Sequence, residues 1–401
     1  MKRSCSFAVL ALLLCPLNLM AAELTGRISL LGLVSDTADG AQVNRNSLSA
    51  NQQSLRLMLQ DFMPNSEWSI HLRSSRLQTN GFAIENSSPS DLFRYRELAG
   101  EAFAHSGDNH QARVRFELDR LHYQRRFSNS SLSIGRQPVD WGSGRFWQPL
   151  NVFGAFAPTD LDTDFKAGID SLIYDWYPTT FSSLSLVYAL APQDEPRFGN
   201  SAALYYRQPA GERSELALLA GEVVDNRVVG ASFESEWSGI GWRVEGIYYD
   251  QADGREDGLF WIAGLDYQFD NGTLLNLEWH QNDLGSSDEM GLTEVADSFL
   301  VQSGLQQQLG RQVLGLGLSD DLTPLLRGSY TLLLSPLRDA DNERHLSSLH
   351  QFTLLYSLSD ESDLLLSALL TSGRGLAASD QPRSEFGHIP NSLTLRWRLY
   401  F

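Results

Sequence analysis

This sequence contains few cysteines, few lysines and few long apolar runs, and these shortages exclude some classes of protein. The 401-residue chain holds two cysteines, Cys5 and Cys15, and Lys166 is the only lysine beyond Lys2. No later stretch approaches the roughly 20 consecutive apolar residues that a transmembrane helix needs. The net charge of −18 excludes a general nucleic-acid binder, because binding to a polyanion requires a basic surface.

The first 22 residues predict a secretory signal peptide. A basic start at Lys2 precedes an apolar run over residues 7–15, and small residues follow at 21 and 22. We expect cleavage after Ala22, which leaves residues 23–401 as one domain with a net charge of −20. Because both cysteines lie in the removed segment, disulfides cannot stabilise the exported chain.

Apolar and polar residues alternate along most of the chain from residue 23 onward. For example, Leu55, Leu57 and Leu59 alternate with polar Ser54 and Arg56. A period of two predicts a strand with one apolar and one polar face. A soluble β-sandwich would also alternate. However, the segments are about ten residues long, as a tilted strand crossing a bilayer requires, and they recur without a domain-like break. The pattern therefore favours a transmembrane barrel.

Short turns rich in Gly, Pro and Asn alternate with long polar stretches between these segments. Outer-membrane barrels have this arrangement, with turns on one side of the membrane and loops on the other. The candidate segments come to about nineteen, although single-chain bacterial barrels have even numbers; the ambiguity lies around residues 308–311. We therefore predict an all-β fold, a transmembrane antiparallel β-barrel of about 18 strands, with 16 as the alternative.

The last segment, residues 391–401, is a strictly alternating strand that ends in phenylalanine. It resembles the terminal signal of Gram-negative outer-membrane β-barrels, which the barrel-assembly machinery reads. Its outward residues Trp397, Leu399 and Phe401 are the candidate assembly signal. The stretch from 134 to 145 looks like one that recurs in porin-like barrels of unassigned substrate. The resemblance implies a bacterial outer-membrane location and contact with outer-membrane lipid and lipopolysaccharide. It is compatible with either a monomer or a homo-oligomer.

A barrel of this size encloses a lumen too wide for side chains to fill, so its inward face should be polar. Both signs of charge occur at the predicted inward positions, and many of these residues would serve only to brace the wall. The candidate pore-lining residues are Arg56, Arg73, Arg113, Arg115, Glu117, Asp119, Arg243, Glu245, Asp266, Glu278 and Arg396.

The stretch 138–165 is the predicted constriction. It carries several aromatic residues, which a solvated loop would leave exposed, so we expect it to fold inward and narrow the pore. An aromatic plug or a subunit contact is the alternative. The candidate residues are Trp141, Arg145, Trp147, Asp160, Asp162 and Asp164.

The aspartates at 160, 162 and 164 do not form a calcium loop of the EF-hand type. Such a loop needs Gly at its sixth position and Glu at its twelfth, where Phe165 and Ser171 stand. We therefore predict no metal site and no cofactor.

These observations together predict a porin-like outer-membrane channel for passive or weakly selective diffusion of small solutes. An enzyme is not expected, because the chain has neither a Gly-x-Ser-x-Gly elbow nor a His-Glu-x-x-His motif. The alternative is a non-conducting barrel that acts as an export or assembly component, or as a lipid-modifying enzyme of the outer membrane.

Overall fold

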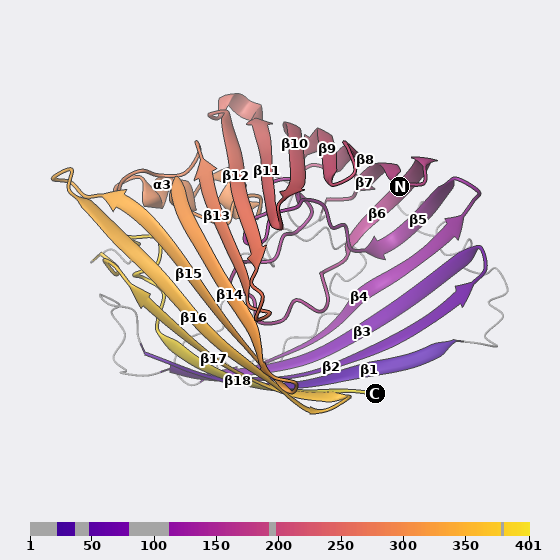
Figure 1. Ribbon diagram of the computed structural model, residues 1–401, viewed down its shortest axis with the longest axis horizontal. Coiled ribbons are helices and arrows are strands. Elements are labelled where there is room, and N and C mark those ends of the chain that lie inside the picture. The colour runs from indigo at the N-terminus through magenta and orange to yellow at the C-terminus, as the bar shows by residue number, and fades with distance from the viewer. Residues whose placement is uncertain (1–21, 37–47, 80–111, 192–197, 378–380) are drawn as a thin grey trace, which may run out of the picture.

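The computed structural model describes residues 22–36, 48–79, 112–191, 198–377 and 381–401. They form a closed antiparallel β-barrel of 18 strands (Figure 1). Each strand pairs with the next along the chain, and the ring closes where β1 pairs with β18. Closure leaves no open sheet edge, which a membrane requires because its interior offers backbone groups no water. The predicted fold class is confirmed. The expected signal peptide, residues 1–22, lies outside the described residues apart from Ala22.

The strands differ in length but follow one another without interruption by a second domain. Their bounds are β1 Glu23–Ser35, β2 Leu48–Met63, β3 Ser66–Thr79, β4 Ala112–Arg126, β5 Ser130–Gln137, β6 Ile169–Thr179, β7 Ser182–Ala189, β8 Ser201–Pro209, β9 Ser214–Val223, β10 Asn226–Trp237, β11 Ile240–Asp250, β12 Gly258–Gln268, β13 Leu274–Asn282, β14 Gln312–Thr323, β15 Leu326–Arg338, β16 Arg344–Ser359, β17 Ser362–Ser372 and β18 Ser392–Tyr400.

Short turns lie at one end of the barrel and most long connections at the other. The β2–β3 turn is two residues long, whereas the β5–β6 connection spans residues 138–168. The beginning of β1 and the end of β18 lie at the short-turn end. By the rule for such barrels, this end faces the periplasm and the long connections face outward from the cell.

The β13–β14 connection explains the surplus strand candidate. Residues 283–311 contain two short helices, α3 Leu292–Ala296 and α4 Phe299–Gln302, instead of a strand. Their apolar residues recur at helical spacing, at 292, 295, 296, 299 and 300. Leu292 and Leu300 are buried, so tertiary packing stabilises these short helices. No helix in the described part of the chain is long and apolar enough to cross a membrane.

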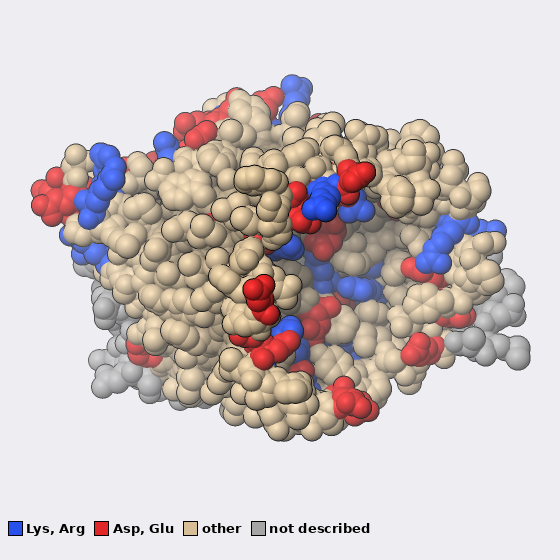
Figure 2. Space-filling view, in the orientation of Figure 1, with Lys and Arg blue, Asp and Glu red and all other residues tan. Residues whose placement is uncertain are grey.

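The two faces of the wall differ as the alternation predicts. Leu55 and Val244 point outward with 37% and 45% of their surface exposed, whereas the neighbouring Arg56 and Arg243 point inward and are buried. Figure 2 shows an outer wall covered mainly by uncharged residues, with charged atoms at the rims and in the central hollow. An outward apolar band with a polar interior is the arrangement of an outer-membrane barrel.

Part of the inner wall is apolar, and this part holds the hydrophobic core. Ile247 and Tyr249 on β11 face inward and pack in one buried cluster with Trp141, Leu150 and Phe153. The last three belong to the connection of residues 138–168, which we call the inner loop. The core therefore lies between the barrel wall and this loop.

Candidate functional site

The inner loop leaves β5, crosses the lumen and returns to β6; Figure 1 shows its purple trace inside the ring of strands. Its aromatic residues pack on the wall: Trp141 stacks on Tyr205 of β8 with ring centroids 4.9 Å apart, and Trp147 is 2% exposed. Burial of these rings gives the loop a fixed position, since apolar contact with the wall removes them from water. The loop therefore lies inside the barrel, with its aromatic rings buried against the inner wall.

Two buried carboxylates fix the first half of the inner loop. Glu278 on β13 accepts hydrogen bonds from the three consecutive backbone N–H groups of residues 145–147, at 2.9, 3.1 and 2.9 Å. Glu245 on β11 accepts from the N–H of Ser143 at 2.5 Å and of Leu150 at 2.8 Å. The structure therefore places Glu245 and Glu278 beneath the loop rather than on the open lumen. Alternation predicts their inward direction, but not what covers them.

Two glycines allow this close packing. Gly142 has a φ of +95°, a conformation that side chains disfavour. At Gly144 a Cβ atom would lie 1.7 Å from the carbonyl oxygen of Trp147 and 2.5 Å from Ile262 on the wall. A side chain at either position would push the backbone away from its two carboxylate acceptors.

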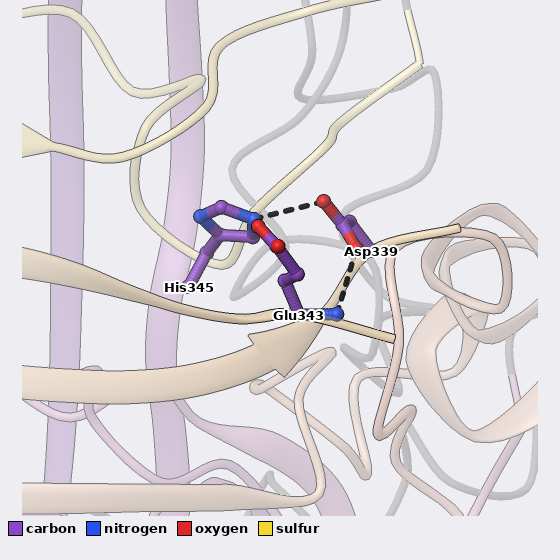
Figure 3. A group of neighbouring side chains, drawn as sticks. All are labelled: Asp339, Glu343 and His345. Atoms are coloured by element: carbon purple, nitrogen blue, oxygen red, sulfur yellow. Dashed lines mark hydrogen bonds and ion pairs between the residues drawn. The ribbon is translucent and has the colours of Figure 1, made fainter. Parts of the chain in front are cut away.

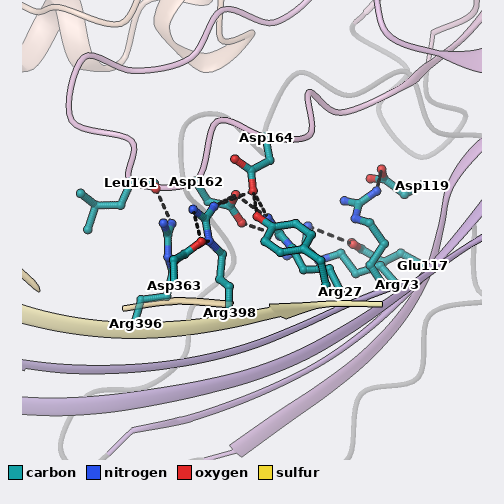
Figure 4. Close-up of polar contacts among 12 residues, drawn as sticks. Arg27, Arg73, Glu117, Asp119, Leu161, Asp162, Asp164, Asp363, Arg396 and Arg398 are labelled. Atoms are coloured by element: carbon teal, nitrogen blue, oxygen red, sulfur yellow. Dashed lines mark hydrogen bonds and ion pairs between the residues drawn. The ribbon is translucent and has the colours of Figure 1, made fainter. Parts of the chain in front are cut away.

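Acidic residues near the end of the inner loop bind the opposite wall. Asp162 pairs with Arg27 of β1 at 2.6 Å, and Asp164 pairs with Arg27 at 2.8 Å and with Arg398 of β18 at 2.5 Å (Figure 4). Burial raises the pKa of Asp162, but the hydrogen bond and charge of Arg27 outweigh it, so the net pKa is lowered. The inner loop is thus attached to the wall on both sides of the lumen.

A row of arginines crosses the wall where the loop is attached. Arg27, Arg56 and Arg73 are direct cross-strand partners on β1, β2 and β3. Like charges directly opposite one another repel, and acidic partners offset this repulsion. Asp119 lies 2.5 Å from Arg56, and Glu117 lies 3.7 Å from Arg73. Arg27 pairs with the two aspartates of the inner loop described above.

Two partly exposed arginines share one carboxylate beside this row. Arg73 and Arg115 share Glu117, at 3.7 and 3.9 Å, and their side chains are 31% and 37% exposed. Arg396 of β18 donates to the backbone carbonyl of Leu161 in the loop (Figure 4). The side chain of Arg113 lies outside the described residues. Arg73 and Arg115 therefore place two partly exposed positive charges beside one largely buried carboxylate.

The wall opposite this row carries a second, smaller charged group. Asp266 on β12 accepts from Arg243 of β11 and, at 3.1 Å, from Arg145 of the inner loop. The Arg145 side chain is 55% exposed, so it faces the lumen, whereas Arg243 is 3% exposed. Asp160 accepts from the N–H of Ala157 at 2.8 Å and closes a turn within the loop.

A cavity of about 430 Å³ lies between the inner loop and the wall formed by β18, β1 and β2. Figure 2 shows blue and red atoms inside the central hollow of the molecule. Charged residues that line this cavity are Arg27, Arg56, Arg73, Arg396, Lys166, Asp160 and Asp162. The arginine row therefore lines one side of this cavity.

Sequence reasoning missed several residues that position the loop. The ring of Phe165 lies 4.8 Å from the guanidinium carbon of Arg27 and 4.2 Å from that of Arg56, a cation–π arrangement. Lys166 is buried and binds Asp140 at 2.7 Å and Asn151 at 2.8 Å, both within the loop. Alternation could have identified Arg27, which occupies an inward position; nothing in the sequence pairs it with this loop.

The class of protein follows from this geometry: an outer-membrane barrel of porin type, with an apolar outer wall, a charged lumen and a loop folded into it. No family model and no curated protein matches the sequence.

Solved structures match the fold over nearly the whole chain. OccK9 (OpdG) of Pseudomonas aeruginosa has 12% identity and a TM-score of 0.60, covering 95% of this chain and 97% of its own. A BenF-like porin from Pseudomonas fluorescens Pf-5 has 8% identity and a TM-score of 0.59, covering 95% and 99%. P. aeruginosa OpdK, solved with vanillate, has 11% identity and a TM-score of 0.57, covering 94% and 98%. At these identities the likeness concerns the fold.

Proposed function

We propose that this protein is an outer-membrane channel through which small solutes diffuse passively, with a weak preference for anions. The observation that carries the proposal is the partly exposed arginine pair Arg73 and Arg115, which share one carboxylate beside the cavity. Charge at a narrow, low-dielectric passage raises the local concentration of ions of opposite sign. The fold neighbour OpdK was solved with vanillate, and a carboxylate of that kind matches the same preference.

The remaining parts of the chain fit this location. Residues 1–22 would direct export, the barrel-assembly machinery would read the last strand, and the outward apolar wall would contact outer-membrane lipid. The inner loop would set the narrowest section, because both of its halves are fixed to the wall.

A non-conducting barrel is the second candidate. The packing of the inner loop on β8 and β11 fills part of the lumen, as it would in a plugged barrel. An assembly component would give no current in a bilayer, so a conductance measurement distinguishes the channel from the non-conducting barrel.

Planar-bilayer recording of the purified protein tests the proposal. We expect discrete channels in about 0.1 M salt, where charges are screened beyond about 10 Å, and a reversal potential that indicates anion preference. Arg73→Gln together with Arg115→Gln should shift the reversal potential toward cation preference, because the two substitutions remove two positive charges from the lumen wall.

Arg213→Gln is the matched control, since this 66%-exposed arginine pairs with Glu236 at the short-turn end. It should leave selectivity unchanged. Absence of current in the wild-type protein would refute the channel, and an unchanged reversal potential in the double variant would refute the role of the arginine pair.

A further inference from the structure

A second group of arginines lies outside the lumen, at the long-loop ends of β14, β15 and β16. A groove of about 740 Å³ opens there, lined by Arg311, Arg338 and Arg344. The tip of the β15–β16 hairpin lies at the upper left of Figure 1, and charged atoms of both signs gather there in Figure 2. The three arginines come from three different segments and converge on one groove.

None of these three guanidinium groups forms an ion pair with a carboxylate within the described part of the chain. Arg311 donates to the backbone carbonyls of Asp283 at 3.0 Å and Gly285 at 3.3 Å. Arg338 donates to the side-chain amide of Asn342 at 2.8 Å. Most described arginines elsewhere in the barrel have an acidic partner, so three arginines in one groove without an ion pair are unusual among the described residues.

The sheet register brings two of the charges together. Arg338 and Arg344 are direct cross-strand partners at the last position of β15 and the first of β16. Like charges in this position destabilise a strand pair. Since no carboxylate among the described residues forms an ion pair with either arginine, an anion bound between them would relieve the repulsion.

The two acidic residues that line the groove, Asp288 and Asp339, are bound to other groups. Asp339 accepts from His345 at 2.9 Å (Figure 3) and from Arg374 at 3.1 Å. The hydrogen bond from His345 contributes most to a lowered pKa of Asp339, about 2, so this carboxylate stays ionised. Asp288 accepts from the N–H of Gly291 at 3.0 Å. Neither carboxylate is directed to the three arginines.

The groove lies directly above the lipid-facing wall. Side chains two residues apart on a strand share a face, about 7 Å apart. Arg344 therefore shares the outward face with Leu346, which is 60% exposed, and Arg338 shares it with Pro336. Met290, 80% exposed, also lines the groove. The positive charges thus stand where the apolar band ends, at the level of lipid headgroups in the outer leaflet.

We propose that this groove binds a phosphate group of a phosphorylated glycolipid of the outer leaflet. The planar guanidinium forks of Arg338 and Arg344 match the oxygens of a phosphate and form charge-assisted hydrogen bonds. The acyl chains of the same lipid would lie on the apolar wall below, against Leu346. This proposal does not depend on conduction through the lumen.

Native mass spectrometry of the full-length barrel in detergent tests the proposal. The probes are a bis-phosphorylated lipid A and the same glycolipid without its phosphates. We expect the wild-type protein to hold the phosphorylated lipid roughly tenfold more tightly than the dephosphorylated one, and Arg338→Gln with Arg344→Gln to abolish that difference.

Arg213→Gln with Arg327→Gln is the matched control, because it removes two exposed arginines at the short-turn end. It should retain the preference. A heat-modifiable band on gel electrophoresis, as in the wild-type protein, establishes that the groove variant is folded. Equal binding by the groove variant, equal binding of the dephosphorylated lipid, or displacement by an equal concentration of inorganic phosphate would each overturn the proposal.

Discussion

Residues of one type play different parts in this barrel, according to whether water reaches them. Arg56 is 4% exposed and pairs with buried Asp119, whereas Arg73 on the next strand is 31% exposed. Glu278, 1% exposed, binds backbone rather than solute. All four positions face inward by alternation. Their separation into structural and solute-facing groups depends on which of them the inner loop covers.

At this scale we expect Glu278→Gln to loosen the inner loop. The carboxylate accepts from three N–H groups at residues 145–147, whereas an amide offers one oxygen and turns a donor toward them. A hydrogen bond to a charged group contributes about 1.5–3 kcal/mol, so a loss of that order should appear as faster amide exchange at these residues.

Glu222→Gln is the control, since Glu222 is exposed. Unchanged exchange at residues 145–147 in Glu278→Gln would show that aromatic packing alone holds the loop.

Among the elements, the long connections bind one another as well as the wall. Glu385, in the β17–β18 connection, accepts from the N–H groups of Leu309 at 3.1 Å and Gly310 at 2.5 Å, in the β13–β14 connection. Burial raises the pKa of Glu385 to about 7, against the lowering effect of the two N–H donors. This contact should therefore respond to pH near neutrality.

We expect the contact to weaken as pH rises. The folded pKa of about 7 lies above the ordinary value of 4.5, so between these values the folded state binds more protons than the unfolded state. Stability is then greatest below pH 4.5 and falls as pH approaches 7, by at most about 3 kcal/mol. Amide exchange at 309 and 310, corrected for its intrinsic pH dependence, should show lower protection at pH 8 than at pH 5.

Glu385→Gln should remove this pH dependence, because the amide does not titrate in that range. Glu343→Gln, an exposed position, should retain it. Protection that is the same at pH 5 and pH 8 in the wild-type protein would contradict the argument.

For the whole molecule, the decisive contact is the one that closes the ring. The N–H of Gly26 donates to the carbonyl of Phe401 at 2.7 Å, and the N–H of Phe401 donates to Gly26 at 3.0 Å. The Phe401 ring covers Gly26 so closely that a Cβ there would lie 2.3 Å from it. The last residue of the candidate assembly signal thus also takes part in closure.

Phe401→Ala should lower the amount of heat-modifiable barrel in outer-membrane fractions, because it removes both the terminal aromatic and the cover over Gly26. Export should be unaffected, since the substitution leaves the predicted signal peptide unchanged. Phe181→Ala is the control: this aromatic is 75% exposed at a short turn. Equal amounts of heat-modifiable barrel in both variants and in the wild-type protein would show that assembly does not require Phe401.

The sequence by itself determined the barrel. Apolar residues at every second position, over segments long enough to cross a bilayer, specify strands with one apolar face. The sheet must close into a barrel because backbone groups at an open edge would have no hydrogen-bond partner in hydrocarbon. The one surplus strand candidate arose because helices α3 and α4 are too short to stand out beside the alternation. The sequence also predicts which side chains point into the barrel, since side chains at successive positions of a strand point to opposite faces.

Only the tertiary structure decided what each inward residue does. Glu278 and the backbone of residue 146 are separated by 132 residues, and Arg27 and Asp162 by 135, and no local pattern encodes such pairings. The same holds for Arg338 and Arg344, whose register across a hairpin brings like charges together on the outer face. Periodicity fixes the face of a strand on which a side chain lies, whereas burial and charge compensation depend on segments that reach that face from elsewhere in the chain.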